Sequence, residues 1–239
     1  MSVQSQIRAW MRELETSPTA TAYADQVRAG VAVGLSGGAD SLALVHGLLR
    51  CGVKVHAVVV DHQLQEGSAQ VARQASEVAL SLGATAEIRT VEVEGPGEGP
   101  ARQARYAALG AAADGRPLLV AHTADDDAEG MLIGLVRGSG AEAIAGMRSV
   151  HTDHVAVTAG AAWLGRPLLN CTREETEAEC RAAGLRCGRI RTTLAMHTCA
   201  AASALTYCHT YKMRSGSTSV RTWHALLGCS AKTLSCSMS

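Results

Sequence analysis

A short stretch near the start of the chain carries residues suited to binding phosphate. An apolar, β-branched segment begins at residue 31, as a buried parallel strand would, and apolar residues recur at helical spacing from residue 42 to residue 49. A glycine turn from a strand into a helix directs backbone N–H groups at one point, at the positive end of the helix dipole. The sequence therefore predicts a phosphate site in the string SGGADS, which comprises Ser36, Gly37, Gly38, Ala39, Asp40 and Ser41.

The order of residues in this string narrows the chemistry. It matches neither the P-loop pattern with its lysine nor the Gly-x-Gly-x-x-Gly pattern of dinucleotide folds. Asp40 cannot attract phosphate by itself, so its carboxylate indicates a magnesium ion between it and the phosphates. The simpler alternative is an ordinary glycine turn before a helix.

A second cluster, residues 122–129, leaves an apolar segment and enters a helical one. It contains His122, Asp125, Asp126, Asp127 and Glu129. Adjacent carboxylates repel one another, so a cation among them would stabilise the cluster. The alternative is an acidic helix start, which the helix dipole favours.

Two further groups of polar residues follow predicted strands or lie on helices. Asp61 and His62 end an apolar run, at the carboxyl end of a strand, where open α/β sheets bind ligands. Arg102 and Arg105 are three residues apart and share a helix face. These arginines could hold phosphates or RNA backbone, or could simply be solvated.

Alternation of strands and helices must position these groups. Residues 1–29 are predicted to be helical with a break at Ser17 and Pro18. Strands are predicted at 53–60, 84–93 and 117–121, and helices at 68–82, 101–113 and 126–137. This alternation predicts an α/β fold with a doubly wound parallel sheet.

Taken together, the motifs resemble one branch of the PP-loop ATP-pyrophosphatase family, the N-terminal domain of the tRNA(Ile)-lysidine synthetases. The matching strings are SGGADS at 36–41, VDH at 60–62, ARQARY at 101–106, HTADDDAE at 122–129, RGSGAEAIAGM at 137–147 and RPLL at 166–169. The resemblance covers roughly residues 25–186. It departs from the family at Asp127, where glutamine is usual, and at Gly130, where threonine is usual.

The resemblance implies a fold of the adenine nucleotide alpha hydrolase type and an ATP-dependent ligase. ATP would bind residues 36–41, with Asp61, His62 and Arg137 nearby and Mg²⁺ at Asp40. The C2 oxygen of the wobble cytidine of tRNA(Ile) would be adenylated, and the amine of free lysine would displace AMP to give lysidine. The catalytic residues would be Asp40, Arg102 and four residues of the second cluster (His122, Asp125, Asp126 and Glu129), without individual roles assigned within the cluster.

Composition gives further expectations about the core, the cysteines and the cellular location. The 239 residues contain 47% hydrophobic residues, enough for a sizeable core, and eight cysteines without a Cys-x-x-Cys pair. We find no signal peptide and no apolar run that would span a membrane, so a cytoplasmic protein with free thiols and no membrane partner is expected. A homodimer is compatible with the sequence.

The C-terminal part, residues 187–239, does not follow the family pattern. It holds six basic and no acidic residues, so the first 186 residues hold 16 basic and 22 acidic ones, a formal net charge of −6. Codons chosen for residues 187–193 can encode WEDPHN in a displaced frame, close to the family's Trp-x-Asp-Pro-x-Asn segment. We therefore interpret residues 1–186 as the ATP-binding catalytic domain and residues 187–239 as a frameshifted, poorly ordered tail.

Two alternatives to a lysidine synthetase stay open. One is another PP-loop ATPase that adenylates a small carbonyl or amide substrate. The other is a nucleotide- or RNA-binding remnant without catalysis. The acidic body disfavours tight tRNA binding by this domain alone, because such binding depends on many phosphate contacts.

Overall fold

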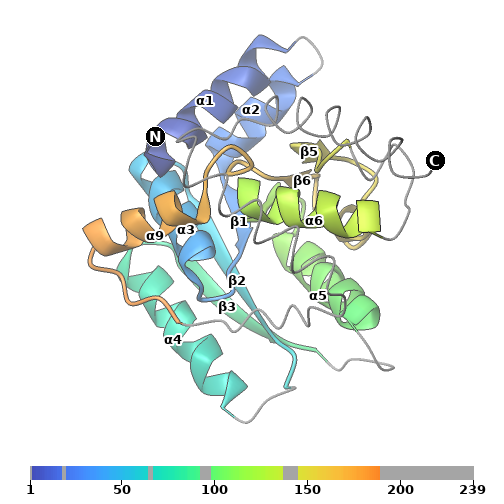
Figure 1. The fold of residues 1–239 in the computed structure, drawn as a ribbon. Coiled ribbons are helices and arrows are strands. Elements are labelled where there is room, and N and C mark those ends of the chain that lie inside the picture. Colours follow the sequence, from blue (N-terminus) through green and yellow to red (C-terminus); the bar gives the residue numbers. More distant parts are fainter. Residues whose placement is uncertain (1, 18–19, 64–66, 92–97, 137–144, 189–239) are drawn as a thin grey trace, which may run out of the picture. The chain divides into compact units, whose positions relative to one another are not determined.

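The structure is a computed structural model that describes residues 2–17, 20–63, 67–91, 98–136 and 145–188. A mostly parallel sheet with helices on both faces organises the first compact unit (Figure 1). The strands are β1 (Val31–Gly34), β2 (Val55–Asp61), β3 (Thr85–Thr90), β4 (Leu118–Leu119), β5 (Val150–His151) and β6 (Leu164–Gly165). The helices are α1 (Val3–Thr16), α2 (Thr21–Ala29), α3 (Ala39–Arg50), α4 (Ser68–Ser81), α5 (Glu98–Ala113), α6 (Ala124–Val136), α8 (Val155–Thr158) and α9 (Arg173–Ala182).

The strand order is β3-β2-β1-β4-β6-β5. Neighbouring strands from β3 to β6 run parallel, which confirms the predicted α/β fold, whereas β5 joins the edge antiparallel to β6. The chain reverses to both sides of β1, so β2 and β4 flank it. Ligands of such sheets bind at the carboxyl ends of the strands beside this reversal.

Both faces of the sheet are covered, and alternate residues of β1 point into different cores. Val31 and Val33 belong to the larger core, with side chains from α1, α3 and α4. Ala32 belongs to the second core, with side chains from α5 and α8. Continuous apolar strands are the signature of a sheet buried on both sides, which accounts for the apolar run found in the sequence.

Predicted and observed elements agree closely up to α6. The predicted break at residues 17–18 separates α1 from α2, and the observed helices and strands to residue 136 fall within a few residues of their predicted positions. Beyond residue 147 the structure adds β5, α8, β6 and α9, none of which the periodicity predicted.

Residues Asp126–Gly146 belong to a second compact unit, and 126–136 and 145–146 of them are described. Within it Gly146 has φ +77°, and a Cβ there would lie 2.9 Å from Oδ2 of Asp127. The Asp127 carboxylate is nearly buried, with 7% of its residue surface exposed. Asp127 therefore packs inside its own unit.

Candidate active site

The SGGADS string forms the turn between β1 and α3, as predicted. The backbone N–H of Ser36 donates to Oγ of Ser41 at 3.2 Å, and that hydroxyl donates to the carbonyl of Gly38 at 3.0 Å. The hydroxyl of Ser36 lies 3.1 Å from Oγ of Ser41 and accepts the N–H of Gly38 at 3.4 Å. The two serines therefore close the loop upon itself.

The loop leads directly into the N-terminus of α3. Gly38 is the N-cap and offers no side chain to the first turn, and Gly37 has φ +81°, a conformation that glycine adopts without strain. The N–H groups of the first turn lack partners inside the helix and carry the positive end of its dipole. This is the arrangement that binds phosphate at helix N-termini.

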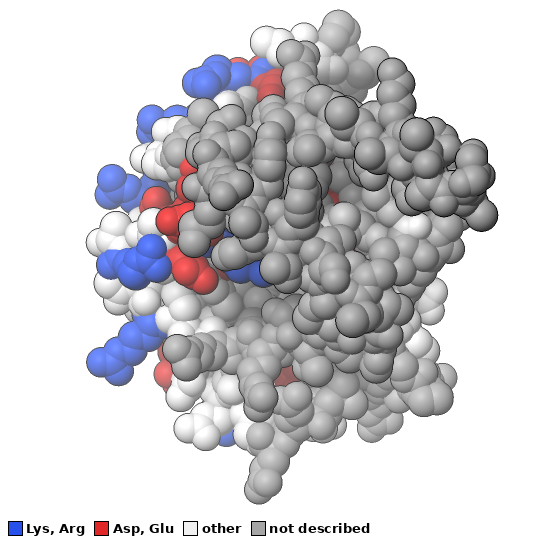
Figure 2. Space-filling view, in the orientation of Figure 1, with Lys and Arg blue, Asp and Glu red and all other residues white. Residues whose placement is uncertain are grey.

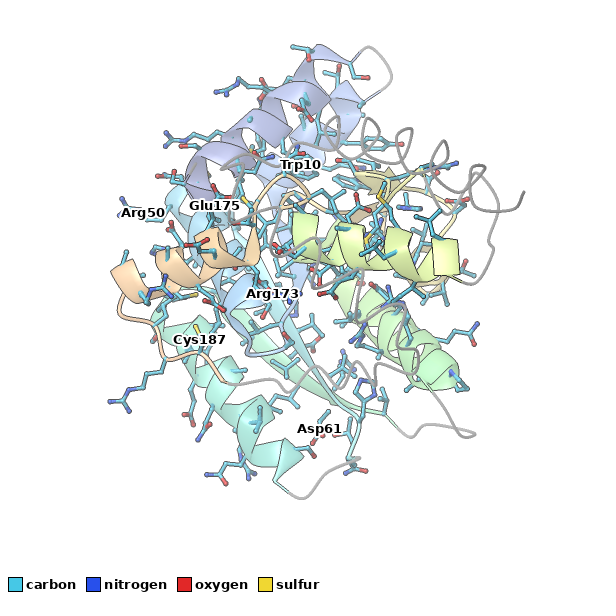
Figure 3. All side chains as sticks on the ribbon, in the orientation of Figure 1. Trp10, Arg50, Asp61, Arg173, Glu175 and Cys187 are labelled. Carbon is cyan, nitrogen blue, oxygen red and sulfur yellow. The ribbon has the colours of Figure 1, made fainter. Side chains whose placement is uncertain are left out.

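Asp40 in that first turn is held by α9. Its Oδ1 accepts a short hydrogen bond from the hydroxyl of Thr176, and its Oδ2 lies 3.8 Å from Nε of Arg173. Figure 3 labels Arg173 on α9, the helix that packs beside α3. Arg173 and Thr176 are site residues that the sequence analysis did not find.

The start of α9 is itself fixed by the second predicted cluster. The backbone N–H of Arg173 donates to Oδ2 of Asp125 at 2.7 Å. Thr172 and Glu175 form a capping box around the same turn. The first turn of α9 thus contacts both Asp40 and Asp125, which are 85 positions apart in the sequence.

His122 follows β4 at the carboxyl edge. Its Nδ1 accepts a hydrogen bond from Nε of Arg166 at 3.0 Å, and Arg166 also donates to the carbonyl of Arg148 at 2.8 Å. Because arginine can only donate, Nδ1 carries no proton, and Nε2 is the protonated nitrogen of this ring. In this state His122 offers an N–H donor at Nε2.

Asp61 and His62 lie at the carboxyl end of β2, as predicted, and Figure 3 labels Asp61 there. The N–H of Gln63 donates to the Asp61 carboxylate at 2.9 Å, and together with the hydroxyl of Ser68 it lowers the pKa of Asp61. Burial and the nearby Arg105 lower the pKa of His62. The Nδ1 atom of His62 is buried and has no hydrogen-bond partner among the described residues.

Arg102 lies on α5 and stacks over the ring of Tyr106, with 5.1 Å between Cζ and the ring centroid. Its guanidinium also donates to the Tyr106 hydroxyl at 3.4 Å. Tyr106 is buried and meets the edge of the His154 ring at a centroid distance of 4.4 Å. A cavity of about 420 Å³ opens between α5 and α8, lined by Gly99, Pro100, Arg102, Gln103, Tyr106, His154 and Val155.

Three other predicted residues belong to the second compact unit or lie outside the described residues. Asp126 and Glu129 belong to the second compact unit, and their roles stay predictions. Arg137 lies outside the described residues. So do residues 189–239, to which the prediction of a poorly ordered tail applies.

The first two residues of the predicted tail are described, and the second of them contacts the loop. The N–H of Gly188 donates to the carbonyl of Gly37 at 2.9 Å, and the partly buried Cys187 packs against the larger core. The sulfur of Cys180, one helix earlier, donates to the carbonyl of Ala39 at 3.3 Å. The backbone of the loop is thereby supported from α9 and from the segment after it.

The carboxylate beside the loop suits a magnesium ion that binds together with a nucleotide. Among the described residues no group of three or more histidine, cysteine or acidic side chains could hold a metal ion. Magnesium in phosphate-binding enzymes is usually held by one or two carboxylates, with phosphate oxygens and waters completing its shell. Asp40 supplies such a carboxylate beside the anion-binding amides.

Comparison with known proteins identifies this architecture. The chain matches the PP-loop domain over residues 11–188. The chain belongs to the PP-loop family. A U34-tRNA thiolase from Methanococcus maripaludis shares the fold of this PP-loop protein, with a TM-score of 0.61 at 14% identity over 89% of this chain and 74% of that one.

Closer relatives carry one name. A tRNA(Ile)-lysidine synthase of Rhodococcus jostii is 49% identical over 158 residues, 65% of this chain and 46% of the relative. The enzyme of that name from Rhodococcus erythropolis is 43% identical over 183 residues, 75% of this chain and 50% of the relative. The chain thus spans about half the length of these curated relatives.

Among the helices in the described part of this PP-loop protein, none is long and apolar enough to cross a bilayer. On the face seen in Figure 2, the described basic and acidic side chains are interspersed.

Proposed function

We propose that this chain is the nucleotide-binding catalytic part of a tRNA(Ile)-lysidine synthase. The observation that carries the proposal is the loop at residues 36–41, closed by its own serines at the N-terminus of α3, in a chain 43–49% identical to enzymes of that name. Its substrates would be ATP, free lysine and tRNA(Ile).

The reaction would proceed in two steps at the carboxyl edge of the sheet. The C2 oxygen of the wobble cytidine attacks the α-phosphorus of ATP, a new O–P bond forms, and the bond to pyrophosphate breaks. The lysine amine then attacks C2, AMP leaves with the oxygen, and a proton is lost from the amine. The cytidine must be unstacked to reach the site, as single-stranded RNA bases often are.

The protein's own groups would stabilise the first step electrostatically. The N–H groups at the start of α3 and the serine hydroxyls bind the phosphates and neutralise charge that develops on the leaving pyrophosphate. Mg²⁺ held by Asp40 would add positive charge at the same phosphates. His122 would position an acceptor through Nε2–H, because its Nδ1 accepts the guanidinium of Arg166.

The carboxylates would serve the second step. Asp125, Asp126 and Glu129 are the candidates for holding the lysine ammonium and receiving its proton. Arg102, backed by the Tyr106 ring, would face the RNA or the phosphates. A cytoplasmic location is part of this proposal and rests on the sequence, and a homodimer is compatible with it.

The first test measures nucleotide binding. Calorimetry with excess Mg²⁺ should show ATP binding by the chain and its loss in Asp40→Ala. Equal affinity of both proteins would remove Asp40 from the site. Arg50→Ala, at the far end of the same helix, is the matched control and should bind like the unchanged chain.

The second test measures the full reaction with labelled lysine and a tRNA(Ile) transcript. A version of the gene with the displaced frame restored from residue 187 should modify tRNA faster than the chain as it stands. Equal rates would contradict the frameshift hypothesis. ATP turnover without tRNA would instead favour a PP-loop ATPase that acts on a small substrate.

A further inference from the structure

The first turn of α9 brings a cation to the phosphate loop. Arg173 begins this helix, its backbone N–H is fixed by Asp125, and its guanidinium faces Asp40. Asp40 lies in the same helical turn as the N–H groups that form the anion site. A bound phosphate chain would therefore lie within one side-chain length of the guanidinium.

We propose that Arg173 is a phosphate-binding catalytic residue of this site, which rests on the proposed function. In the nucleotide-free chain its guanidinium neutralises Asp40. When ATP binds, Asp40 would hold Mg²⁺, and the guanidinium of Arg173 would turn to the phosphate oxygens. Guanidinium groups suit this task because their fork of donors matches phosphate geometry.

The geometry of the ion pair favours such an exchange. The distance of 3.8 Å between Nε and Oδ2 is longer than a hydrogen bond, so the pair is a loose one. The side chain of Arg173 is 37% exposed and that of Asp40 27% exposed, which leaves the guanidinium room to turn. An incoming triphosphate carries more charge than one carboxylate and competes successfully for the cation.

Thr176 allows Asp40 to change partners at the same time. Its hydroxyl contacts two acceptors, Oδ1 of Asp40 and, at 2.8 Å, the carbonyl of Arg173. A hydroxyl has one proton, so it can donate to either acceptor but not to both at once. Thr176 is fully buried, and the second acceptor lets the hydroxyl stay satisfied when Asp40 turns to a metal ion. We assign Thr176 as a positioning residue for Asp40.

In the reaction the guanidinium would act on the leaving group. The bond from the α-phosphorus to pyrophosphate breaks, and negative charge grows on the pyrophosphate oxygens. A cation that contacts these oxygens stabilises the transition state more than the substrate, which raises kcat as well as affinity. The backbone N–H of Arg173, which anchors α9, is unaffected when the side chain is replaced.

The test compares Arg173→Ala, Arg173→Lys and the control Arg181→Ala. Arg181 is on the same helix but pairs with Glu177 at the surface. Calorimetry with ATP, with inorganic pyrophosphate and with adenosine should show about tenfold or greater loss for Arg173→Ala with the first two ligands only. Arg173→Lys should recover part of that loss, and Arg181→Ala should equal the unchanged chain.

Two results would overturn the assignment. Equal loss for ATP and adenosine would show that Arg173 only shapes the fold, and unchanged ATP binding would remove it from the site. If Arg173→Ala fails to fold, the same binding comparison is made with Arg173→Lys alone. Lysine keeps the positive charge but lacks the forked set of guanidinium donors. Failure of the unchanged chain to bind ATP would count against the proposed function itself.

Thr176 is tested through the metal dependence of ATP binding. Thr176→Val removes the hydroxyl at nearly constant volume, and Thr176→Ser keeps it. The Mg²⁺ concentration at half-maximal ATP binding should shift several-fold in the valine variant and return in the serine variant. The same midpoint in both variants would show that Thr176 does not act through Asp40.

Discussion

Two places at the carboxyl edge of the sheet, the phosphate loop after β1 and the end of β2, differ in whether their polar groups find partners within the protein. At the phosphate loop, Ser36 and Ser41 bind each other and the backbone, and Asp40 is held by two side chains of α9. At the end of β2, the Nδ1 atom of His62 is buried and finds no partner in the part of the chain that the structure describes. Buried polar atoms without partners are rare and costly.

The phosphate loop and the His62 end therefore differ in where their hydrogen-bond partners come from. The loop is built from six consecutive residues and is closed before any ligand arrives. The His62 end requires a donor or acceptor from outside the described residues, such as a ligand group or an ordered water. Nucleotide binding should therefore depend on backbone conformation at the first end and on a single side-chain atom at the second.

The largest effect should come from the loop backbone. Gly37 and Gly52 both have positive φ, +81° and +80°, and a Cβ at Gly37 would lie 3.2 Å from the Cβ of Ala75, while Gly52 has open space. Gly37→Ala and Gly52→Ala should each lose about 1–2 kcal/mol of stability through the strained backbone. Only Gly37→Ala should lose ATP affinity, by more than about tenfold, as measured by calorimetry.

Comparing these two variants separates the effect of backbone strain, which both share, from the effect of a Cβ in the phosphate loop, which only Gly37→Ala has. Comparable ATP affinity in both would show that the loop tolerates a shift of its backbone. The comparison drawn above would then fail at its better-ordered end.

A smaller effect is expected at His62. Asparagine places an amide near the position of Nδ1, whereas leucine fills similar space without a polar atom. His62→Leu should weaken ATP binding by about five- to tenfold, the value of one hydrogen bond, and His62→Asn should stay near the unchanged chain. Equal affinities for all three proteins would show that Nδ1 faces water and not a ligand.

His62 should also contribute to the pH dependence of the free energy of unfolding. Burial lowers the pKa of His62, His151 and His154 in the folded chain, so the unfolded chain binds more protons just below the ordinary value of about 6.5. The free energy of unfolding should be fully retained above pH of about 6.5 and fall as the pH drops towards the lowered values. Urea unfolding at several pH values measures this slope, which His62→Asn should reduce in part.

The smallest effect concerns the rate at which cysteine thiols are alkylated. Burial raises the pKa of Cys180 and raises that of Cys171 to about 12, and both side chains are almost inaccessible. Because the thiolate is the reactive form, alkylation at pH 8 should reach the half-exposed Cys51 and Cys187 before the other two cysteines of the described residues. Peptide mapping by mass spectrometry would check this order, and rapid labelling of Cys180 would mean that the loop opens readily.

Sequence reasoning succeeded where signals were local. A strand, a glycine turn and a helix follow one another within some twenty residues around the SGGADS string, so their order predicts the loop. The ends of β2 and β4 were found for the same reason, and with them Asp61, His62 and His122.

It failed where elements are short or partners are distant. β5 and β6 contain two residues each, too few for a period to appear. Arg173 and Thr176 contact Asp40 across more than 130 positions, and neither carries a motif. Thr172 and Glu175 did offer a capping-box signal for the start of α9, which alone would have placed Arg173 in a first turn.

The hydrogen bond from Gly188 to Gly37 has a consequence for tethering. Consecutive Cα atoms are about 3.8 Å apart, so a group bonded directly to Gly188 starts beside the backbone of Gly37 in the phosphate loop. A short flexible linker engineered after Gly188 would give an attached group an effective concentration in the millimolar range. A fluorophore or RNA-binding module joined just after residue 188 would therefore sample the nucleotide site without any affinity of its own.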